Sequence, residues 1–377
     1  MNVTATESRG WGWAAHLRAG GTTPWAAWRG EAPAEPVMAG ALPGAEQLEL
    51  LRRLNLTGPV PQALAERVLT TTAPGRGRRG LPLAGDGPPP AYGVAPVDPA
   101  GLGSAELLRG ASLLLAQDLV AGAVDPEPRS RWRRRLRARY RIAGDGWLTG
   151  PLRDELGRRG RPEGGRGMTV YVVGAPVDEM LCDVWTARCF GQGVVAFDTW
   201  LDRVVRRGGL PARADLVRIA RWWVERIGRE RVRVVLDPNR LPELLGTRGP
   251  LPGRPRISAD AAEVARQVGP ALALLVGPEE RARLLRRGLL PRLRRVSPPT
   301  PASPALAVPG RHRDWVATQA RAQRDALVAD GYDFCGDPDL LLPRQAAAPA
   351  ATGPAPDTER ALALTLRLLV DGPRRNA

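Results

Sequence analysis

The chain has 377 residues and a formal net charge of +16, and all 55 of its basic side chains are arginines. Without lysine, it cannot complete a Walker-type phosphate loop, supply the strand lysine of a protein kinase or form a pyridoxal Schiff base. Two histidines, His16 and His312, are too few for a histidine-rich metal centre, and three cysteines are too few for a disulfide scaffold. We therefore predict no metal site and reduced thiols.

The amino-acid usage is typical of a very GC-rich, actinobacterial type of genome, because alanine, glycine, proline and arginine dominate and lysine is absent. Arginine abundance alone therefore indicates nothing about partners. The length predicts two or three domains. No apolar run reaches the ~18 residues of a membrane span, and the N-terminus lacks the pattern of a signal peptide. We expect a soluble cytoplasmic protein.

The charge excess is internal. Residues 1–70 and 311–377 each carry equal numbers of arginines and acids, so the whole excess lies between 71 and 310. It is densest at 129–141, where eight arginines are interleaved with Trp132 and Tyr140.

Three interpretations of this basic run stay open. Its arginines could pair with acids elsewhere in the chain, or hold a small phosphorylated or sulfated ligand through Arg133, Arg134 and Arg135. They could also grip a nucleic-acid backbone, with the aromatic side chains stacking on bases. Nucleic acid is the least favoured partner, because no zinc-finger, helix-turn-helix or RNA-recognition signature is present.

Taken in chain order, the first elements are helical. Residues 1–70 hold amphipathic segments, including 45–55, and Thr23-Pro24 is a typical helix start. Residues 71–103 are rich in proline and glycine and indicate a linker. Residues 104–167 begin with a helix to about residue 121 and continue into the arginine-rich segment.

The segment 168–343 alternates between two patterns. Short apolar runs at 169–173 and 232–236 predict buried strands, 332–335 predicts a further strand, and 272–276 fits either a strand or a helix end. Helical patterns separate these runs. We therefore predict an α/β fold, with a doubly wound, mainly parallel sheet preceded by a mostly helical N-terminal region.

The C-terminal part of the chain continues this pattern. Residues 344–357 form an alanine- and proline-rich linker, and 358–377 hold a final helix that we expect Thr358 to cap.

Three passages within 169–343 resemble bacterial, especially actinobacterial, sulfotransferase-like proteins. The passage 221–235 (RWWVERIGRERVRVV) is similar to their helix-into-strand passage, and 257–266 is similar to a late helix. Asp314-Trp315 with 331–343 (GYDFCGDPDLLLP) is similar to their C-terminal helix and turn. The resemblance covers under half of the chain and includes no catalytic motif. It implies an α/β fold and, if it is functional, a 3′-phosphoadenosine nucleotide as cofactor.

The chain departs from this family at the donor loop. Sulfotransferases hold their nucleotide sulfate donor with a lysine-containing loop after a strand, through backbone amides and the lysine. Here the loop is Gly174-Ala-Pro-Val-Asp-Glu-Met180, which has no lysine and two acids that repel an anion. The only GTT is Gly21-Thr22-Thr23, where Arg18 is a weak substitute for the lysine. We therefore expect no transferase activity.

Residues with possible chemistry are few. Asp178, Glu179 and Asp183 follow a strand, where a carboxylate could act as general base, although acids there also stabilise a helix N-terminus. His16 lies beside the GTT sequence and is a weak catalytic candidate. The remaining candidates have structural explanations that we favour, as buried thiols, helix caps, turn residues or a surface histidine: Cys182, Cys189, Asp237, Asp337, Asp339 and His312.

Two functional hypotheses follow. The first is a divergent sulfotransferase-like protein without transferase activity that binds an anionic ligand through arginines. The second is a non-enzymatic protein that binds a polyanion or another partner through the basic run 129–141.

Overall fold

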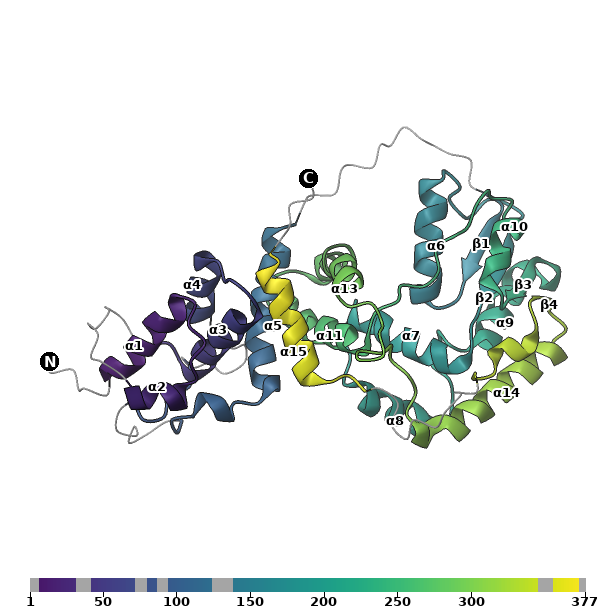
Figure 1. Ribbon diagram of the computed structural model, residues 1–377. Helices are drawn as coiled ribbons and strands as arrows, with labels where there is room; N and C mark the ends of the chain where they lie inside the picture. The colour runs from purple at the N-terminus through teal and green to yellow at the C-terminus, as the bar shows by residue number, and fades with distance from the viewer. Residues whose placement is uncertain are drawn as a thin grey trace. The chain divides into compact units, whose positions relative to one another are not determined.

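The computed structural model of the chain describes residues 7–31, 42–71, 80–86, 94–123, 138–344 and 355–372 (Figure 1). They form two compact units that are interleaved along the sequence. The first contains residues 1–124, 260–297 and 356–377, and the second contains 125–259 and 298–355. These units differ from the sequential domains that the sequence suggests, because helices far apart in the chain share one core.

The first unit is helical. Its helices are α1 (Glu7–Arg18), α2 (Trp25–Glu31), α3 (Ala45–Thr57), α4 (Gln62–Thr70), η1 (Pro99–Gly101), α5 (Ser104–Ala121), α11 (Ala259–Ala273), α12 (Pro278–Arg283), the π-helix η4 (Leu284–Leu289), α13 (Leu290–Val296) and α15 (Thr358–Val370). Leucines fill its centre: α5 buries Leu108 and Leu115, and α15 buries Leu362 and Leu366 against the neighbouring helices. The expected helical N-terminal region is thus confirmed, and the C-terminal helix is part of it.

The segment 272–276 belongs to a helix end. The backbone amides of Leu275 and Val276 both donate to the carbonyl of Leu272, which closes the last turn after α11. No described strand of the sheet pairs with this segment, so of the two interpretations the helix end is correct.

The second unit contains a four-stranded parallel sheet in the order β1-β2-β3-β4. The strands are β1 (Tyr140–Ala143), β2 (Thr169–Val173), β3 (Val232–Val235) and β4 (Asp333–Cys335). Val172 is aligned with Ala143 on one side and with Val234 on the other, and Val234 is aligned with Phe334.

Helices surround this sheet: α6 (Gly146–Arg158), α7 (Val177–Cys189), α8 (Phe197–Arg207), α9 (Leu216–Ile227), η2 (Arg229–Arg231), η3 (Pro238–Arg240), α10 (Leu241–Leu244), η5 (Gly310–His312), α14 (Arg313–Ala329) and η6 (Pro338–Leu341). Val170, Tyr171, Val172 and Val173 are all at least 93% buried. Successive strand residues face opposite sides, so both faces of β2 are covered. The predicted α/β fold with a parallel sheet is confirmed.

Strand β1 was not among the sequence predictions. It follows the arginine-rich run, and Arg141 faces solvent while Ile142 is fully buried. The residues Arg139, Tyr140, Arg141 and Ile142 alternate between charged and apolar, as in a strand with one exposed face, but they belong to the basic run and were interpreted as part of it. Only pairing with β2 stabilises the short segment Tyr140–Ala143 as a strand.

The strand order follows the chain order without a reversal. Ligands of open parallel sheets bind at the carboxyl ends of strands where the order reverses. The order of these four strands creates no such crevice. A candidate site must therefore be located from the arrangement of individual side chains. Among the described residues, no helix is long and apolar enough to cross a membrane.

Candidate functional site

An acidic cluster lies at the start of α7, directly after β2. Glu179 forms an ion pair with Arg254, and Asp183 Oδ2 lies 3.1 Å from Arg254 Nη1. The guanidinium of Arg344 is 3.6 Å from Glu179. The structure thus brings Glu179 and Asp183 together around one arginine that the sequence did not single out.

Burial dominates the electrostatics of this cluster. It raises the pKa of Asp183 to about 7, although the nearby Arg254 guanidinium favours the charged form. Burial also raises the pKa of Asp178 and the pKa of the Cys182 thiol. Asp183 is therefore a carboxyl group that exchanges its proton near neutral pH, as a general base requires.

Two further contacts hold the segments on either side of the acidic cluster. Trp147 donates its indole N–H to the carbonyl of Pro255 at 3.1 Å, which holds the segment that carries Arg254. Leu216 and Leu236 pack against Gly174, where an added Cβ would lie 2.4 Å from Leu216 Cδ1. Apolar side chains and an internal ion pair thus surround the loop 174–180, which the sequence predicted to lack a donor-binding role. A catalytic role for Asp178 and Glu179 stays a prediction.

The other strand ends carry structural carboxylates. Asp237 accepts a hydrogen bond from the amide of Asn239, and Asp337 accepts one from the amide of Asp339. Asp339 in turn forms an ion pair with Arg324 at 2.8 Å. These contacts match the predicted cap and turn roles.

His16 lies on α1 and organises the GTT loop. Its Nε2 is 3.0 Å from Thr23 Oγ1, and its ring stacks on Trp28 with 4.7 Å between the ring centroids. Asn55 donates to the carbonyls of Leu17 and Gly21, which fixes the same loop. These contacts connect α1, the loop and α3, as a structural histidine would.

The structure describes only one of the four arginines that the sequence predicted to bind an anion. Arg18 forms an ion pair with Glu66 at 3.3 Å, so its guanidinium is directed to a carboxylate within the helical unit. Arg133, Arg134 and Arg135 lie outside the residues that the structure describes. Of the basic run, only the segment 138–141 is described.

His312 and the cysteines have structural surroundings. His312 Nε2 is 2.8 Å from Asp202 Oδ1, and the imidazole and Arg311 lower the pKa of Asp202 through hydrogen bonds. Cys182 and Cys189 are both buried. Among the described residues, no group of three or more histidine, cysteine or acidic side chains is arranged to hold a metal ion.

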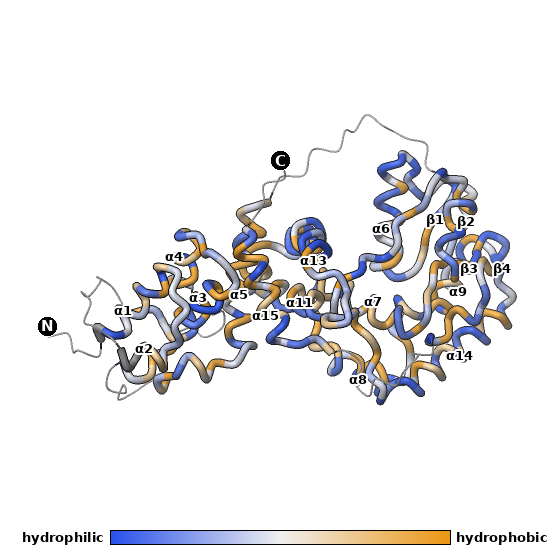
Figure 2. The backbone as a smooth tube through the Cα atoms, viewed as in Figure 1, coloured by the Kyte–Doolittle hydropathy of each residue, from blue (hydrophilic) through white to orange (hydrophobic). Residues whose placement is uncertain are grey.

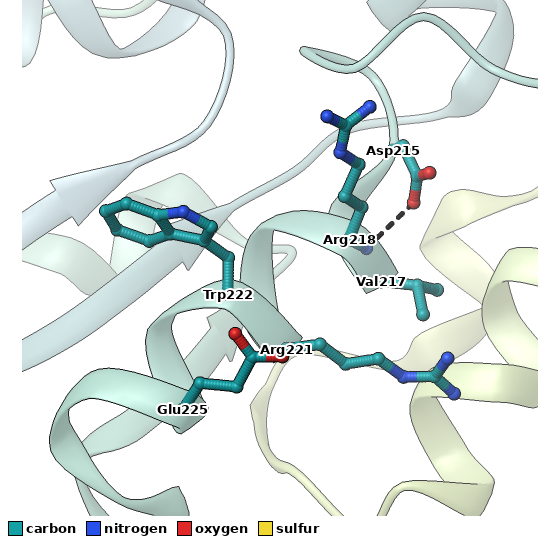
Figure 3. A pocket seen from close by; sticks show the side chains of 6 residues that line it. All are labelled: Asp215, Val217, Arg218, Arg221, Trp222 and Glu225. Carbon is teal, nitrogen blue, oxygen red and sulfur yellow. Dashed lines mark hydrogen bonds between the residues drawn. The ribbon is translucent and has the colours of Figure 1, made fainter.

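A surface hollow of about 420 Å³ lies along α9 (Figure 3). We call it the α9 hollow, and its lining residues are Asp215, Val217, Arg218, Arg221, Trp222 and Glu225. Asp215 begins the helix by accepting a hydrogen bond from the amide of Arg218. Leu216 and Ala220 are buried on the opposite side of α9. The helix is therefore fixed in the unit while one stripe of it faces solvent.

Trp222 is the exposed aromatic side chain of this hollow, with 45% of its surface accessible. Arg226 lies over its ring at 3.3 Å from the centroid and donates to the carbonyl of Trp222. The neighbouring Trp223 meets Trp222 edge to face, and Arg141 of β1 lies 5.2 Å from the Trp223 ring centroid. The indole is thus held in place before any ligand arrives.

The charges of the hollow are only partly compensated. Arg221 donates to both carboxylate oxygens of Asp330 at 2.8 and 3.0 Å. By contrast, neither the guanidinium of Arg218 nor the carboxylate of Glu225 forms a side-chain hydrogen bond or ion pair with another described residue. One cation and one anion therefore remain available on either side of Trp222.

The α9 hollow was not among the sequence predictions. The signal that could have found it is the Trp222-Trp223 pair, because side chains at adjacent helix positions point about 100° apart. On a helix with only one buried face, one of two neighbouring tryptophans therefore lies nearer the solvent.

Comparisons with known proteins give no relative for this chain. No family model, no curated protein and no solved structure matches it.

Proposed function

We propose that the chain is a binding protein for a small anionic ligand with a planar ring, and that the α9 hollow is its site. The observation that carries this proposal is the fixed, half-exposed Trp222 between Arg218 and Glu225, neither of which pairs with a side chain in the described part of the chain. Preformed concave sites with an aromatic wall and a few polar groups are typical of small-ligand binding.

The spacing of the charges defines the ligand. Arg218 and Glu225 are seven residues apart, so they lie on one face of α9 about 10 Å apart along the axis. A ligand that stacks on Trp222 would place its anionic group at Arg218 and an N–H donor of its ring at Glu225. Nucleoside monophosphates carry these groups at opposite ends. Aromatic amino acids carry both charges at the same end and fit less well.

The acidic cluster after β2 argues against a sulfuryl-transfer reaction at this loop. The loop after β2 lacks a lysine, and Glu179 and Asp183 already hold Arg254 in an ion-pair cluster. A phosphosulfate group there would face carboxylates and the Leu216 side chain. The sulfotransferase-like resemblance and a cytoplasmic location remain parts of this proposal.

Titration calorimetry tests the ligand class with adenosine 5′-monophosphate, L-tryptophan and inorganic phosphate as separate probes. We expect the nucleotide to bind more tightly than phosphate or L-tryptophan. Arg218→Ala should weaken nucleotide binding about tenfold or more, since a charge-assisted hydrogen bond contributes about 1.5–3 kcal/mol. Arg207→Ala removes an equally exposed arginine from α8 and should leave binding unchanged.

Two results would reject the proposal: no heat at millimolar nucleotide, or equal affinities for nucleotide and phosphate. A thermal shift with 3′-phosphoadenosine 5′-phosphate tests the resemblance separately. Stabilisation that survives Arg218→Ala would favour a donor-type site elsewhere in the chain.

The second candidate function, polyanion binding through the basic run, keeps one structural support. Arg141 is exposed and lies over Trp223, next to the α9 hollow. Since the remaining arginines of the run lie outside the described residues, this candidate rests on the sequence.

A further inference from the structure

A second charged surface lies in the helical unit, on the continuous segment α12–η4–α13 between Pro278 and Val296. This segment carries seven arginines at 281, 283, 286, 287, 292, 294 and 295, against two acids, Glu279 and Glu280. Figure 2 shows much of it in the blue of hydrophilic residues near the label α13. It is the most basic helical segment among the described residues.

The apolar side of this segment is already used. Leu284, Leu285, Leu289 and Leu293 are all buried. At Gly288 the π-helix approaches α5 so closely that an added Cβ would lie 3.1 Å from the Leu119 side chain. The helix is therefore anchored by its leucines, and it presents no free apolar face.

Arg292 adds a polar anchor. It donates to the carbonyls of Leu368 and Gly372 at 2.6 and 3.2 Å, at the end of α15. Burial lowers the pKa of Arg292, and the like charge of Arg295 acts in the same direction. Arg292 thus donates its hydrogen bonds to the end of α15, whereas the like charges of Arg292 and Arg295 repel each other.

Four arginines of this segment are exposed: Arg286, Arg287, Arg294 and Arg295. Arg287, Arg294 and Arg295 form no side-chain hydrogen bond or ion pair with any other residue in the described part of the chain. By contrast, Arg283 is paired with Glu280. We call Arg287, Arg294 and Arg295 the arginine strip.

We propose that the arginine strip binds the phosphodiester backbone of nucleic acid without reading its sequence. Arg287 lies in the π-helix and Arg294 seven residues later in α13, so the two are roughly 10 Å apart along the segment. Three cations spread over this distance fit a chain of repeated anions rather than a single phosphate group. Like-charged arginines in solvent gain most from a partner whose own counterions they release.

An anionic membrane is the less suitable partner. A helix that binds at a membrane interface inserts an apolar face between the lipids. The leucines of this segment are instead packed into the protein. Guanidinium groups also match phosphate oxygens in a two-pronged geometry that suits a backbone contact.

Fluorescence anisotropy with a labelled 20-base-pair DNA duplex and the full chain tests this inference over a range of salt concentrations. We compare the triple variant Arg287→Gln, Arg294→Gln, Arg295→Gln with the control triple Arg203→Gln, Arg206→Gln, Arg207→Gln. The control removes the same charge from exposed arginines of α8. The strip variant should reduce the slope of log K against log salt by about 2–3, since each phosphate contact contributes about 0.9.

At 50 mM salt, the strip variant should also bind the duplex at least tenfold more weakly than the control. Equal effects of the two triples would overturn the proposal, because net charge alone would then explain binding. No effect of either triple would also overturn it, because the arginine strip would then not contribute to binding. Binding to vesicles containing phosphatidylserine without binding to DNA would also overturn it. Should the triple lose its cooperative melting, Arg287→Gln alone must lower the slope by about 0.9. Nucleotide binding at the α9 hollow should be unchanged in all strip variants.

Discussion

Asp183 Oδ2 lies 3.1 Å from Arg254 Nη1, and Asp183 is nevertheless a carboxyl group whose pKa is about 7. Burial favours the neutral acid, and the arginine favours the carboxylate. Glu179 shares the same guanidinium and has Arg344 at 3.6 Å besides, whereas Arg254 is the only cation paired with Asp183 among the described residues. Because burial outweighs the single arginine, this cluster makes stability depend on pH near neutrality.

We predict that Asp183 makes the protein less stable as pH rises from about 4 to about 7. Its folded pKa is raised, so the folded state holds a proton that the unfolded chain releases, and the free energy of unfolding falls across this window. The change is on the order of a few kcal/mol, since one pKa unit corresponds to about 1.4 kcal/mol. Urea unfolding between pH 4 and 8 should show a smaller decline for Asp183→Asn. Parallel curves for the two proteins would contradict this assignment.

Arg254→Met should destabilise the protein more at pH 8 than at pH 5. At pH 8 the variant leaves an ionised Asp183 without its guanidinium and Glu179 with Arg344 alone, whereas at pH 5 Asp183 is protonated. Breaking a buried ion pair costs about 3–5 kcal/mol, and we expect about 2–3 kcal/mol at pH 8, because the arginine is a quarter exposed. The control is Arg207→Met, which should change stability equally little at both pH values.

Gly174→Ala should cost about 1–3 kcal/mol of stability, because the added Cβ would lie 2.4 Å from Leu216 Cδ1 and 3.0 Å from Leu236 Cδ2. Leu216→Ala creates space at the same point and loses packing of its own. The double variant should therefore be more stable than the sum of the single effects predicts. Strict additivity in denaturant unfolding would show that Leu216 does not fill this loop.

Asp357→Ala should destabilise the helical unit by about 1 kcal/mol, because the Asp357 carboxylate accepts the hydrogen bond from the amide of Arg360 that begins α15. Thr358→Ala is the matched control and should have little effect, since Thr358 is already inside the helix. Thermal unfolding followed by circular dichroism compares the two. A larger effect of Thr358→Ala would contradict the assignment of Asp357 as the N-cap and would favour Thr358, which the sequence predicted.

Local patterns were enough to predict most elements. The apolar runs that became β2 and β3 were recognised as buried strands because strands covered by helices need no alternation, and 332–335 was recognised as a further strand. The presence of helical segments between these strands was also recognised. Strand β1 was missed because its alternation of arginines with apolar residues was interpreted as part of the basic run, and pairing of Arg141 and Ile142 with Val170 and Tyr171 makes it a strand.

The candidate sites were predictable only in part. The sequence showed Asp178, Glu179 and Asp183 after a strand, yet it could not show Arg254, which is 71 residues from Asp183. The α9 hollow depends on which of Trp222 and Trp223 faces solvent, and this choice is made by packing against the sheet.

The sequence by itself determined the composition-level facts: 55 arginines without a lysine, a charge excess within 71–310, and an α/β pattern. Its charge count could not distinguish arginines that hold the fold from arginines that remain free. Tertiary structure decided this, because pairing requires an acceptor at hydrogen-bond distance. Arg254 and Arg292 reach carboxylates and carbonyls from distant segments, whereas Arg218 and the arginine strip reach no partner within the described chain.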